Sequence, residues 1–224
     1  MTQDFGKKVR GGLFITIEGI HGCGKSTQIE LLDKKLKGQG FKPVLTKEVA
    51  GTPIADEIYK LAFKEGGEAF GNPLLMTLLI ATSRASRVDK IIKPVVQKGG
   101  VVLADRYEGS MIVFQHYCQG VDLKLINLLN KHITQGVHAN ITFVIDLDPK
   151  IALIRKRTSL KVGEKLTGWD ARKLQFHRKS RLAYQNLCKS QKNWILLDGR
   201  QTAQELSEVI FSKVIESINR KNAK

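Results

Sequence analysis

Long apolar runs are missing from this 224-residue sequence. The longest, such as Leu74–Ile80, fall far short of the roughly 18 residues that a membrane-spanning helix needs. The N-terminal residues contain no apolar segment of the secretory type, so we expect a cytoplasmic protein. Cysteine is also scarce. Cys23, Cys118 and Cys188 share no metal-ligand spacing and cannot all pair, which favours reduced thiols over a disulfide framework.

Acidic residues are few relative to basic ones. The chain has 37 Lys and Arg against 21 Asp and Glu, a formal net charge of +16. Such an excess suits anionic partners such as nucleotides, nucleic acid or a membrane surface. The basic residues are spread along the chain apart from clusters at 7–10, 155–165 and 172–181, and most are expected on a solvated surface. The charge by itself therefore names no partner.

What the sequence does contain is an alternation of strand and helix patterns. Strands are expected at 13–17, 43–46, 101–104, 141–145 and 194–197. Helices are expected at about 25–38, 52–64, 73–98, 107–117, 122–135, 149–158, 170–190 and 202–220. Apolar strands separated by helices predict an α/β fold, a five-stranded parallel sheet with helices on both faces. Ligands of such sheets sit beyond the carboxyl ends of the strands.

No repeat or low-complexity linker divides the chain. We therefore expect a single domain over residues 13–224, a length that suits one α/β domain. Residues 1–12 are expected to form a flexible basic N-terminal tail.

The stretch Gly19–Ser26 satisfies the phosphate-loop pattern G-x4-G-K-[ST]. Glycines let several backbone N–H groups point at the same phosphate oxygens, and the following helix adds the positive end of its dipole. Lys25 is placed to reach the β- and γ-phosphates of a nucleoside triphosphate, and the Ser26 hydroxyl to bind Mg²⁺. A chance match is the alternative, which the flanking strand and helix disfavour. The residues expected to bind the triphosphate are Gly19, Ile20, His21, Gly22, Cys23, Gly24, Lys25, Ser26 and Thr27.

Asp105 and Arg106 directly follow the apolar strand 101–104. A carboxylate at this place can hold Mg²⁺ or a metal-bound water. An arginine beside it would partly neutralise a metal ligand, so it makes sense where a second anion must approach the γ-phosphate. Two unit charges about 4 Å apart repel by about 4 kcal/mol at an effective dielectric constant of about 20, and a bidentate guanidinium offsets that repulsion. An adjacent surface pair at a strand end is the alternative.

Four segments together resemble the thymidylate kinase family, P-loop enzymes that transfer phosphate from ATP to dTMP. FITIEGIHGCGKSTQ is similar to the family's strand and P-loop, and DRYEGSMIVFQ to its D-R-Y-x-x-S-x-x-A-Y-Q pattern. SRASRVDKIIKPVVQKGGVVLADRY is similar to the segment that leads into this pattern, and FHRKSRLAYQNL to the F-x-x-x-V-R-x-x-Y helix. The resemblance covers about residues 13–215 and implies a three-layer P-loop NTPase fold with ATP and Mg²⁺ as cofactors. It also implies a homodimer, for which the apolar faces expected at 73–98 and 107–135 would serve, although burial in the core explains those faces equally well.

The resemblance implies roles for individual residues. Arg106 would grip the acceptor monophosphate, and Asp105 would sit at the metal between donor and acceptor. Arg84 would contact the base, and its helical spacing of four from Ile80 allows this, although a salt-bridged helix surface is the alternative. The residues expected to bind the acceptor are His21, Lys47, Ile80, Arg84, Arg106, Ser110 and Gln115.

The basic stretch RKRTSLKVGEK resembles the family's mobile lid, expected at about residues 155–170. In the family, an arginine that neutralises the transferring phosphoryl group comes from the P-loop or from the lid, and this P-loop has Gly22 where some members place it. The resemblance therefore implies that the lid supplies the cation, with a solvated charged loop as the alternative. The candidates are Arg155, Arg157, Lys161 and Lys165. The residues expected to act in catalysis are Lys25, Asp105, Arg106, Arg155 and Arg157.

Several positions depart from the family pattern. His21 stands where the family usually has a carboxylate that reaches the 3′-hydroxyl of the acceptor. Ile80 replaces an aromatic residue that stacks on thymine, a loss of roughly 1 kcal/mol. TKEVAGT stands in place of T-R-E-P-G-G-T, so Lys47, Val49 and Ala50 differ. The lid has 167–170 (Thr-Gly-Trp-Asp) instead of D-R-x-E.

These patterns predict a nucleoside monophosphate kinase that transfers the γ-phosphate of ATP to dTMP. No general base is required, because the acceptor is already an anionic phosphate oxygen. The alternatives are a related kinase with a shifted acceptor, a kinase of a non-nucleotide phosphate, and a non-catalytic nucleotide-binding homologue. The last would bind oligonucleotides in a salt-sensitive way, and the presence of Lys25, Ser26, Asp105 and Arg106 argues against it. No membrane partner and no specific nucleic-acid binding are expected.

Overall fold

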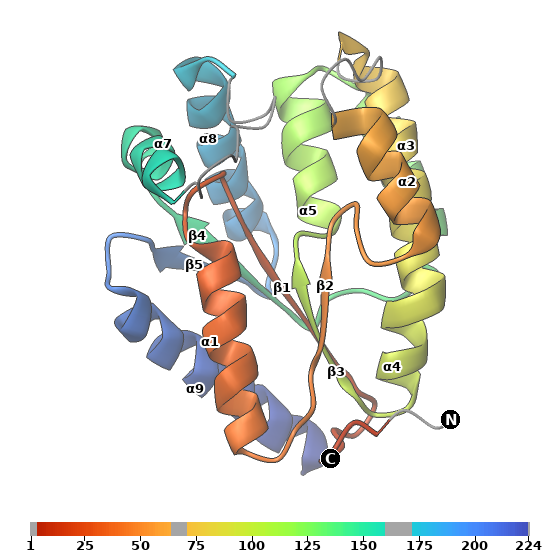
Figure 1. Ribbon diagram of the computed structural model, residues 1–224, viewed down its shortest axis with the longest axis vertical. Helices are drawn as coiled ribbons and strands as arrows, with labels where there is room; N and C mark the ends of the chain where they lie inside the picture. The colour runs from red at the N-terminus through yellow and green to blue at the C-terminus, as the bar shows by residue number, and fades with distance from the viewer. Residues whose placement is uncertain (1–3, 64–70, 160–171, 224) are drawn as a thin grey trace.

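The computed structural model describes residues 4–63, 71–159 and 172–223. They form a five-stranded sheet between layers of helices (Figure 1). The strands are β1 (Leu13–Gly19), β2 (Val44–Lys47), β3 (Val101–Asp105), β4 (Ile141–Asp146) and β5 (Trp194–Asp198). Their order across the sheet is β2-β3-β1-β4-β5, and every pairing is parallel. The predicted sheet and each of its strands are confirmed.

Burial along the strands follows their place in the sheet. Every residue of β1 and β3 is buried, whereas β2 and β5, at the two edges, each have only one buried residue. Leu13, Ile15 and Ile17 of β1 point into one core, and Phe14 points into a second core on the opposite face. Successive side chains of a strand face opposite sides, so one apolar strand supplies both cores.

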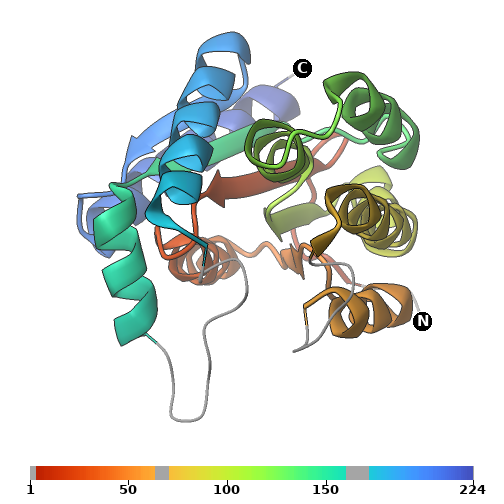
Figure 2. The ribbon, with the colours of Figure 1, turned by 90° about the horizontal axis from the view of Figure 1, so that it is seen from above.

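Helices cover both faces of the sheet. They are α1 (Lys25–Gly38), α2 (Pro53–Phe63), α3 (Pro73–Arg87), η2 (Val88–Ile92), α4 (Lys93–Gln97), α5 (Glu108–Met111), η3 (Ile112–Cys118), α6 (Leu123–Ile133), α7 (Pro149–Thr158), α8 (Leu174–Ser190) and α9 (Ala203–Asn222). Seen from above, α1 lies on one face, and α8 and the α5 region lie on the other (Figure 2). α9 packs beside α1. None of these described helices is long and apolar enough to cross a bilayer.

Two of the predicted helices contain turns of π-helix. The helix expected at 73–98 is α3, the π-helical turn η2 and α4 in succession, and the helix expected at 107–117 continues from α5 into the π-helical η3. A π-turn inserts an extra residue into the hydrogen-bonding pattern and is common at functional sites. η3 carries Phe114 and Gln115, both of which reach the cavity described below.

The N-terminal segment is not a flexible tail over its described residues, which corrects the expectation for residues 1–12. Phe5 and Val9 are 5% and 1% exposed. The Val9 amide donates to the Gly99 carbonyl over 2.9 Å, and the Lys42 amide to the Phe5 carbonyl over 3.0 Å. Two apolar side chains in a basic segment are enough to anchor it, because Val9 packs into one hydrophobic core and Phe5 into the other. Residues 1–3 lie outside the described part of the chain.

The carboxyl ends of the strands meet at one edge of the sheet. The end of β2 pairs with the end of β3 at Lys47 and Asp105, and β1 ends at Gly19, where the P-loop begins. This edge is where a parallel sheet offers its binding crevice. The sequence motifs are therefore brought together by the fold.

Candidate active site

Three glycines shape the loop between β1 and α1. Gly19, Gly22 and Gly24 have φ angles of 136°, 77° and 107°, a region that residues with a Cβ rarely adopt. Gly24 directly precedes α1, so the backbone N–H groups of the loop lie next to the N-terminus of this helix. That is the arrangement that binds phosphate in P-loops.

Gly22 also has no room for a side chain. A Cβ at this residue would overlap the carbonyl oxygen of Ala152 in α7 and would lie 3.0 Å from the Cβ of Lys156. The P-loop thus packs directly on the α7 backbone. Both the backbone conformation of residue 22 and its contact with α7 therefore require a glycine at this position.

Lys25 lies at the floor of the loop with 7% of its surface exposed. Its Nζ donates to the Ile20 carbonyl over 3.1 Å and lies 4.0 Å from the Cys23 Sγ. Burial, together with the positive charge of Arg106, lowers the pKa of Lys25 despite the opposing charge of Asp105. An anion placed beside Lys25 would remove this destabilisation of its charge.

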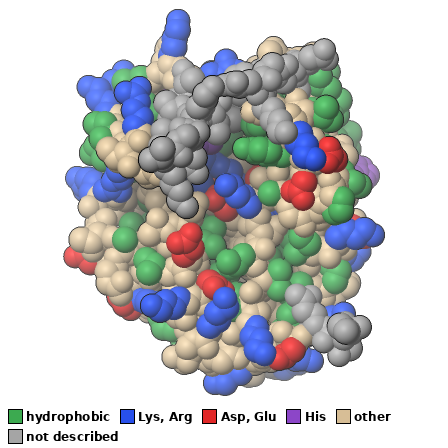
Figure 3. All heavy atoms as spheres, viewed as in Figure 1, with side chains coloured by type: hydrophobic (Ala, Val, Ile, Leu, Met, Phe, Trp, Pro, Cys, Tyr) green, Lys and Arg blue, Asp and Glu red, His purple; other side chains and the backbone are tan. Residues whose placement is uncertain are grey.

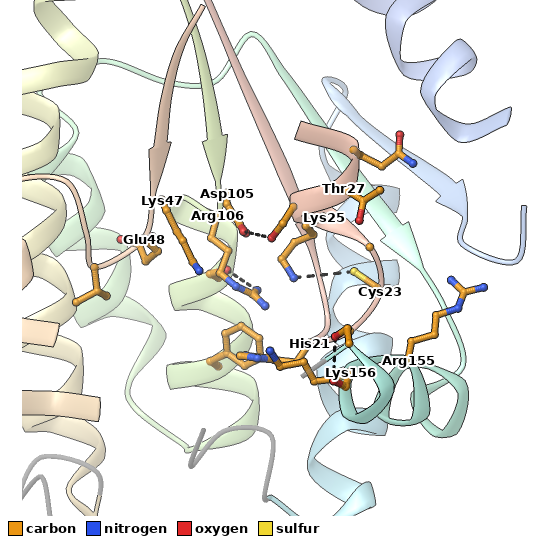
Figure 4. Close-up of a pocket in the computed structure, with 18 of the residues that line it drawn as sticks. His21, Cys23, Lys25, Thr27, Lys47, Glu48, Asp105, Arg106, Arg155 and Lys156 are labelled. Carbon is orange, nitrogen blue, oxygen red and sulfur yellow. Dashed lines mark hydrogen bonds between the residues drawn. The ribbon is translucent and has the colours of Figure 1, made fainter. Parts of the chain in front are cut away.

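Ser26 and Asp105 meet across the gap between α1 and β3. The Ser26 hydroxyl donates to Asp105 Oδ2 over 3.2 Å (Figure 4), and among the described residues Asp105 Oδ1 is buried with no hydrogen-bond partner. Burial alone would raise the pKa of Asp105, but the charges of Lys25, Arg106 and Lys47 outweigh it and leave the pKa below its usual value. Asp105 is therefore an anion with a free oxygen, as a metal ligand must be.

Arg106 has a left-handed backbone, with φ of 74°. A non-glycine residue in this conformation costs roughly 1–2 kcal/mol, and it persists only where its surroundings enforce it. Its amide donates to the Ile17 carbonyl over 3.2 Å, and its guanidinium carbon lies 4.9 Å from the centre of the Phe114 ring. Its NH1 donates to the Ser110 and Tyr184 hydroxyls, each over 3.1 Å.

Glu18 lies behind Arg106 and was not among the residues predicted for the site. It is fully buried in β1, and its Oε2 is 4.0 Å from Arg106 NH1. It accepts from the Tyr107 amide over 2.8 Å and from the hydroxyls of Ser110 and Tyr184 over 2.7 Å and 2.8 Å. The sequence did carry a signal, since Glu18 is the one acidic residue in the buried strand β1. A buried carboxylate needs several hydrogen-bond donors around it, which marks such a residue as part of a polar cluster.

One cavity of about 690 Å³ contains most of the predicted residues. Its lining includes the loop from His21 to Thr27, together with Lys47, Ile80, Asp105, Arg106, Ser110, Gln115 and Arg155. Figure 4 shows Lys25, Lys47 and Arg106 converging on it from three separate elements. Gly19 and Ile20, which precede His21 in the loop, are not in the lining.

The two ends of the cavity differ in character. One end is apolar and aromatic, lined by Tyr59 and Phe63 of α2, Ile80 of α3 and Phe114 of η3. The other end continues past the P-loop to Arg200, Gln201, Thr202 and Leu206, at the start of α9. His21 lines the cavity next to its apolar end, with its ring centre 5.9 Å from that of Phe114. The aromatic side chains of α2 were not predicted, because the spacing within α2 does not reveal which face it turns to the cavity.

Arg84 is buried away from the cavity lining. Its guanidinium donates to Glu48 Oε2 over 2.9 Å, to Asn130 Oδ1 over 2.8 Å and to the Tyr107 carbonyl over 2.9 Å. Glu48, which also accepts from Arg87 NH1 over 2.8 Å, lies between Arg84 and the cavity and lines it. The predicted base contact of Arg84 therefore stays a prediction. In this structure the arginine reaches the cavity only through Glu48.

The described part of the predicted lid brings one of the expected cations and one unexpected cation to the cavity. Arg155 lines it and donates to the Gly199 carbonyl over 3.1 Å. Lys156, which was not predicted, lines it as well, whereas Arg157 is exposed and does not. Successive helical residues point about 100° apart, so three neighbours cannot share one face. Lys161, Lys165 and the segment 167–170 lie outside the described residues.

Comparison with known proteins gives consistent matches. The family model described as "Thymidylate kinase" matches residues 17–210. The thymidylate kinase of Halothermothrix orenii is 40% identical over 205 residues, which cover 91% of this chain and 96% of that protein. Those of Geotalea daltonii and Caldanaerobacter subterraneus are 34% and 35% identical. These two alignments cover 93% and 92% of this chain and 99% and 96% of the relatives.

Proposed function

This chain belongs to the thymidylate kinase family and is an ATP:dTMP phosphotransferase, and on that premise we propose that Arg106 draws the phosphate of dTMP to the γ-phosphate of ATP. The position of Arg106 carries the proposal. It follows Asp105 at the end of β3, and its guanidinium lies in the same cavity as Lys25 of the P-loop. Two phosphate anions repel by several kcal/mol at close approach, and a fixed guanidinium between them offsets that repulsion.

The P-loop is proposed to hold the ATP phosphates. Its backbone N–H groups and the N-terminus of α1 supply partial positive charge, and Lys25 supplies a full one. The lowered pKa of Lys25, caused mainly by burial, supports an anion as its missing partner. The end of the cavity at Arg200 and Leu206 then remains for the adenosine.

Ser26 and Asp105 are proposed to hold Mg²⁺. The free, buried Oδ1 of Asp105 and the adjacent Ser26 hydroxyl are both oxygen ligands of the kind that Mg²⁺ prefers. When bound, the ion supplies charge neutralisation on the phosphate oxygens. The lowered pKa of Asp105 supports an ionised ligand at neutral pH.

Catalysis is proposed to rest on position and charge. The acceptor oxygen needs no base, so Lys25 and Arg106 hold the two phosphates in line and balance the charge that develops between them. Arg155 and Lys156 of α7 are the described candidates for a further cation at the transferring group. Which of them, or of Lys161 and Lys165, acts in this way stays a prediction.

The apolar end of the cavity is proposed to take the acceptor base. Ile80 and Phe114 offer it flat apolar contact, and the buried Nε2 of Gln115 has no hydrogen-bond partner among the described residues. This amide is placed to donate to a carbonyl on the ring. His21 stands where the sugar would pass, so we propose that His21 and Ile80 adjust acceptor choice.

A homodimer and a cytoplasmic location are also proposed. Exposed leucines on α3 and α6, which pack against each other, support the dimer. Large apolar side chains left on the surface of neighbouring helices are common where copies of a chain associate.

Arg106→Ala tests the proposed role directly. We expect kcat/KM for dTMP to fall on the order of 100-fold or more, since a charged contact to the phosphate is lost in a buried site. The KM for ATP should change little, because the P-loop is untouched. Coupled measurement of ADP formation with Mg²⁺ and each of dTMP, dUMP, dCMP and dGMP gives both the effect and the acceptor preference.

Arg220→Ala is the matched control, because this arginine lies on the exposed side of α9 with 67% of its side chain accessible. It should leave ADP formation unchanged. Full activity of Arg106→Ala with every acceptor would overturn the proposed mechanism.

A further inference from the structure

The side chains behind Arg106 form a connected polar cluster. We call Glu18, Ser110 and Tyr184 the Arg106 brace. They come from β1, α5 and α8, three elements far apart in the sequence, and Arg106 itself from the end of β3. Glu18, Ser110 and Tyr184 are 0%, 4% and 2% exposed. A polar cluster this deep is costly unless its members satisfy one another.

The donors and acceptors of the brace follow from the chemistry of its members, apart from the contact between Ser110 Oγ and Tyr184 Oη, which lie 3.0 Å apart and of which either could donate. Arg106 NH1 can only donate, so the Ser110 and Tyr184 hydroxyls accept from it, each over 3.1 Å. Each hydroxyl then has one proton to donate, and Oε2 of Glu18 lies 2.7 Å from Ser110 Oγ and 2.8 Å from Tyr184 Oη. Glu18 therefore directs both hydroxyl protons away from the arginine and leaves their lone pairs facing it.

This arrangement fixes one edge of the guanidinium and leaves the other edge available. Among the described residues, NH1 makes both hydrogen bonds of the Arg106 side chain, and Nε and NH2 bond to none of them. Phe114 lies against the guanidinium plane, with its ring centre 4.9 Å from the guanidinium carbon. A planar group held along one edge and on one side has a single orientation, even though the Arg106 backbone is strained at φ of 74°.

We propose that Glu18, Ser110 and Tyr184 are positioning residues that hold the Arg106 guanidinium in its phosphate-binding orientation before the acceptor arrives. This inference rests on the acceptor-phosphate role proposed for Arg106. It adds that the arginine is pre-organised by a buried carboxylate acting through two hydroxyls. Such pre-organisation lowers the entropy lost on binding and fixes the contact distance in the transition state.

The titration behaviour of Tyr184 and Arg106 agrees with this assignment. Burial, followed by the charge of Glu18, raises the pKa of Tyr184 well above its usual value, so its hydroxyl keeps the proton that it donates. The pKa of Arg106 is raised, because the neighbouring Tyr184, Asp105 and Glu18 outweigh the effect of burial. The guanidinium is thus charged at all working pH values.

A double-mutant cycle between Tyr184→Phe and Arg106→Ala tests the proposal. Tyr184→Phe removes one hydroxyl and keeps the ring. With Arg106 present it should lower kcat/KM for dTMP roughly 10-fold, divided between a higher KM for dTMP and a lower kcat, with the KM for ATP unchanged. With Arg106→Ala as the background, the same substitution should have no further effect. Where turnover is too slow, the Kd for dTMP from calorimetry replaces KM.

Ser180→Ala is the matched control, because it removes a buried hydroxyl from the same helix, one turn away. That hydroxyl donates to the Phe176 carbonyl over 2.9 Å and has no contact with Arg106. It should leave the KM for dTMP unchanged. If Tyr184→Phe does not fold, Ser110→Ala takes its place in the same cycle, since its hydroxyl occupies the equivalent place in the brace.

The outcomes separate the two proposals. Equal effects of Tyr184→Phe with and without Arg106, or an unchanged KM for dTMP, would overturn the positioning role and leave the role of Arg106 standing. Full activity of Arg106→Ala alone would instead overturn the proposed function, and the brace with it.

Discussion

Glu18 is a carboxylate buried inside the protein, where a charge costs free energy. Burial raises its pKa above the usual value, although the charge of Arg106 and the donors Ser110, Tyr107 and Tyr184 oppose that rise. A raised folded-state pKa means that the folded protein takes up this proton more readily than the unfolded chain. The folded state is then most stable, relative to the unfolded chain, at low pH. It loses stability as pH rises from the unfolded pKa of Glu18 through its folded pKa.

Glu18→Gln should remove this pH dependence, since glutamine does not titrate. Urea unfolding of both proteins between pH 4.5 and pH 8 checks it: the stability of the wild type relative to the variant should decrease as pH rises above about 4.5. A relative stability that increases over this range would mean that the charge of Arg106 outweighs the cost of burial.

Individual residues differ in how far a sequence can place them. Lys25, Ser26, Asp105 and Arg106 were predictable because local spacing, a strand before and a helix after, fixes where they point. The hydrogen-bond partners of the buried charges were not predictable, because they are distant in the sequence. Glu48 lies 36 residues from Arg84, and Glu18 lies 166 residues from Tyr184. Likewise, the choice of Lys156 over Arg157 depends on how α7 is rotated against the P-loop, which only the fold determines.

The elements were predicted closely because their patterns are local. Each strand was expected within two residues of its ends, since apolar β-branched runs bounded by turns leave little choice. The π-helical turns η2 and η3 could not be foreseen, because segments of 5 and 7 residues are too short for their apolar spacing to separate a π-turn from an α-turn. Such turns are selected by tertiary packing, in η3 by the placement of Phe114 and Gln115 at the cavity.

α9 begins with a capping box. The Thr202 hydroxyl oxygen accepts from the Glu205 amide over 3.2 Å, and Glu205 Oε2 accepts from the Thr202 amide over 2.8 Å. Thr202→Ala should cost about 1 kcal/mol of unfolding free energy. In a chain of this size that corresponds to roughly 2–4 °C in Tm, measurable by calorimetry.

Thr82→Ala serves as the control for this substitution. Thr82 is exposed in the interior of α3, where its hydroxyl donates to the Leu78 carbonyl over 2.9 Å, and alanine has the better helix propensity there. It should leave the Tm unchanged or raise it slightly. Equal losses in both variants would show that the cap contributes nothing specific.

The charge of the whole molecule is dispersed. Lys and Arg side chains are spread over the face seen in Figure 3, without one continuous basic patch. Several of the cations instead converge inside the cavity, among them Lys25, Lys47, Arg106, Lys156 and Arg200. The local excess of positive charge there, more than the total of +16, is what suits two nucleotide ligands.

The proposed homodimer predicts a specific effect of one surface leucine. Leu74 and Leu78, one turn apart on α3, are 49% and 43% exposed. Leu78→Glu would place a charge in an apolar interface and should shift the protein from twice the 25.0 kDa chain mass to that mass, as seen by light scattering. Leu182→Glu, on α8 and 57% exposed in the structure, should keep the mass of the wild type. A wild type of single-chain mass would refute the dimer.

The contact between Gly22 and the Ala152 carbonyl limits how this active site can change. A cation cannot be introduced at residue 22 by one substitution, because the α7 backbone already occupies the space that its Cβ would need. A variant with any side chain at this residue would have to shift α7 as well. Under the proposed function, the further cation at the transferring phosphate would then have to come from a position other than residue 22.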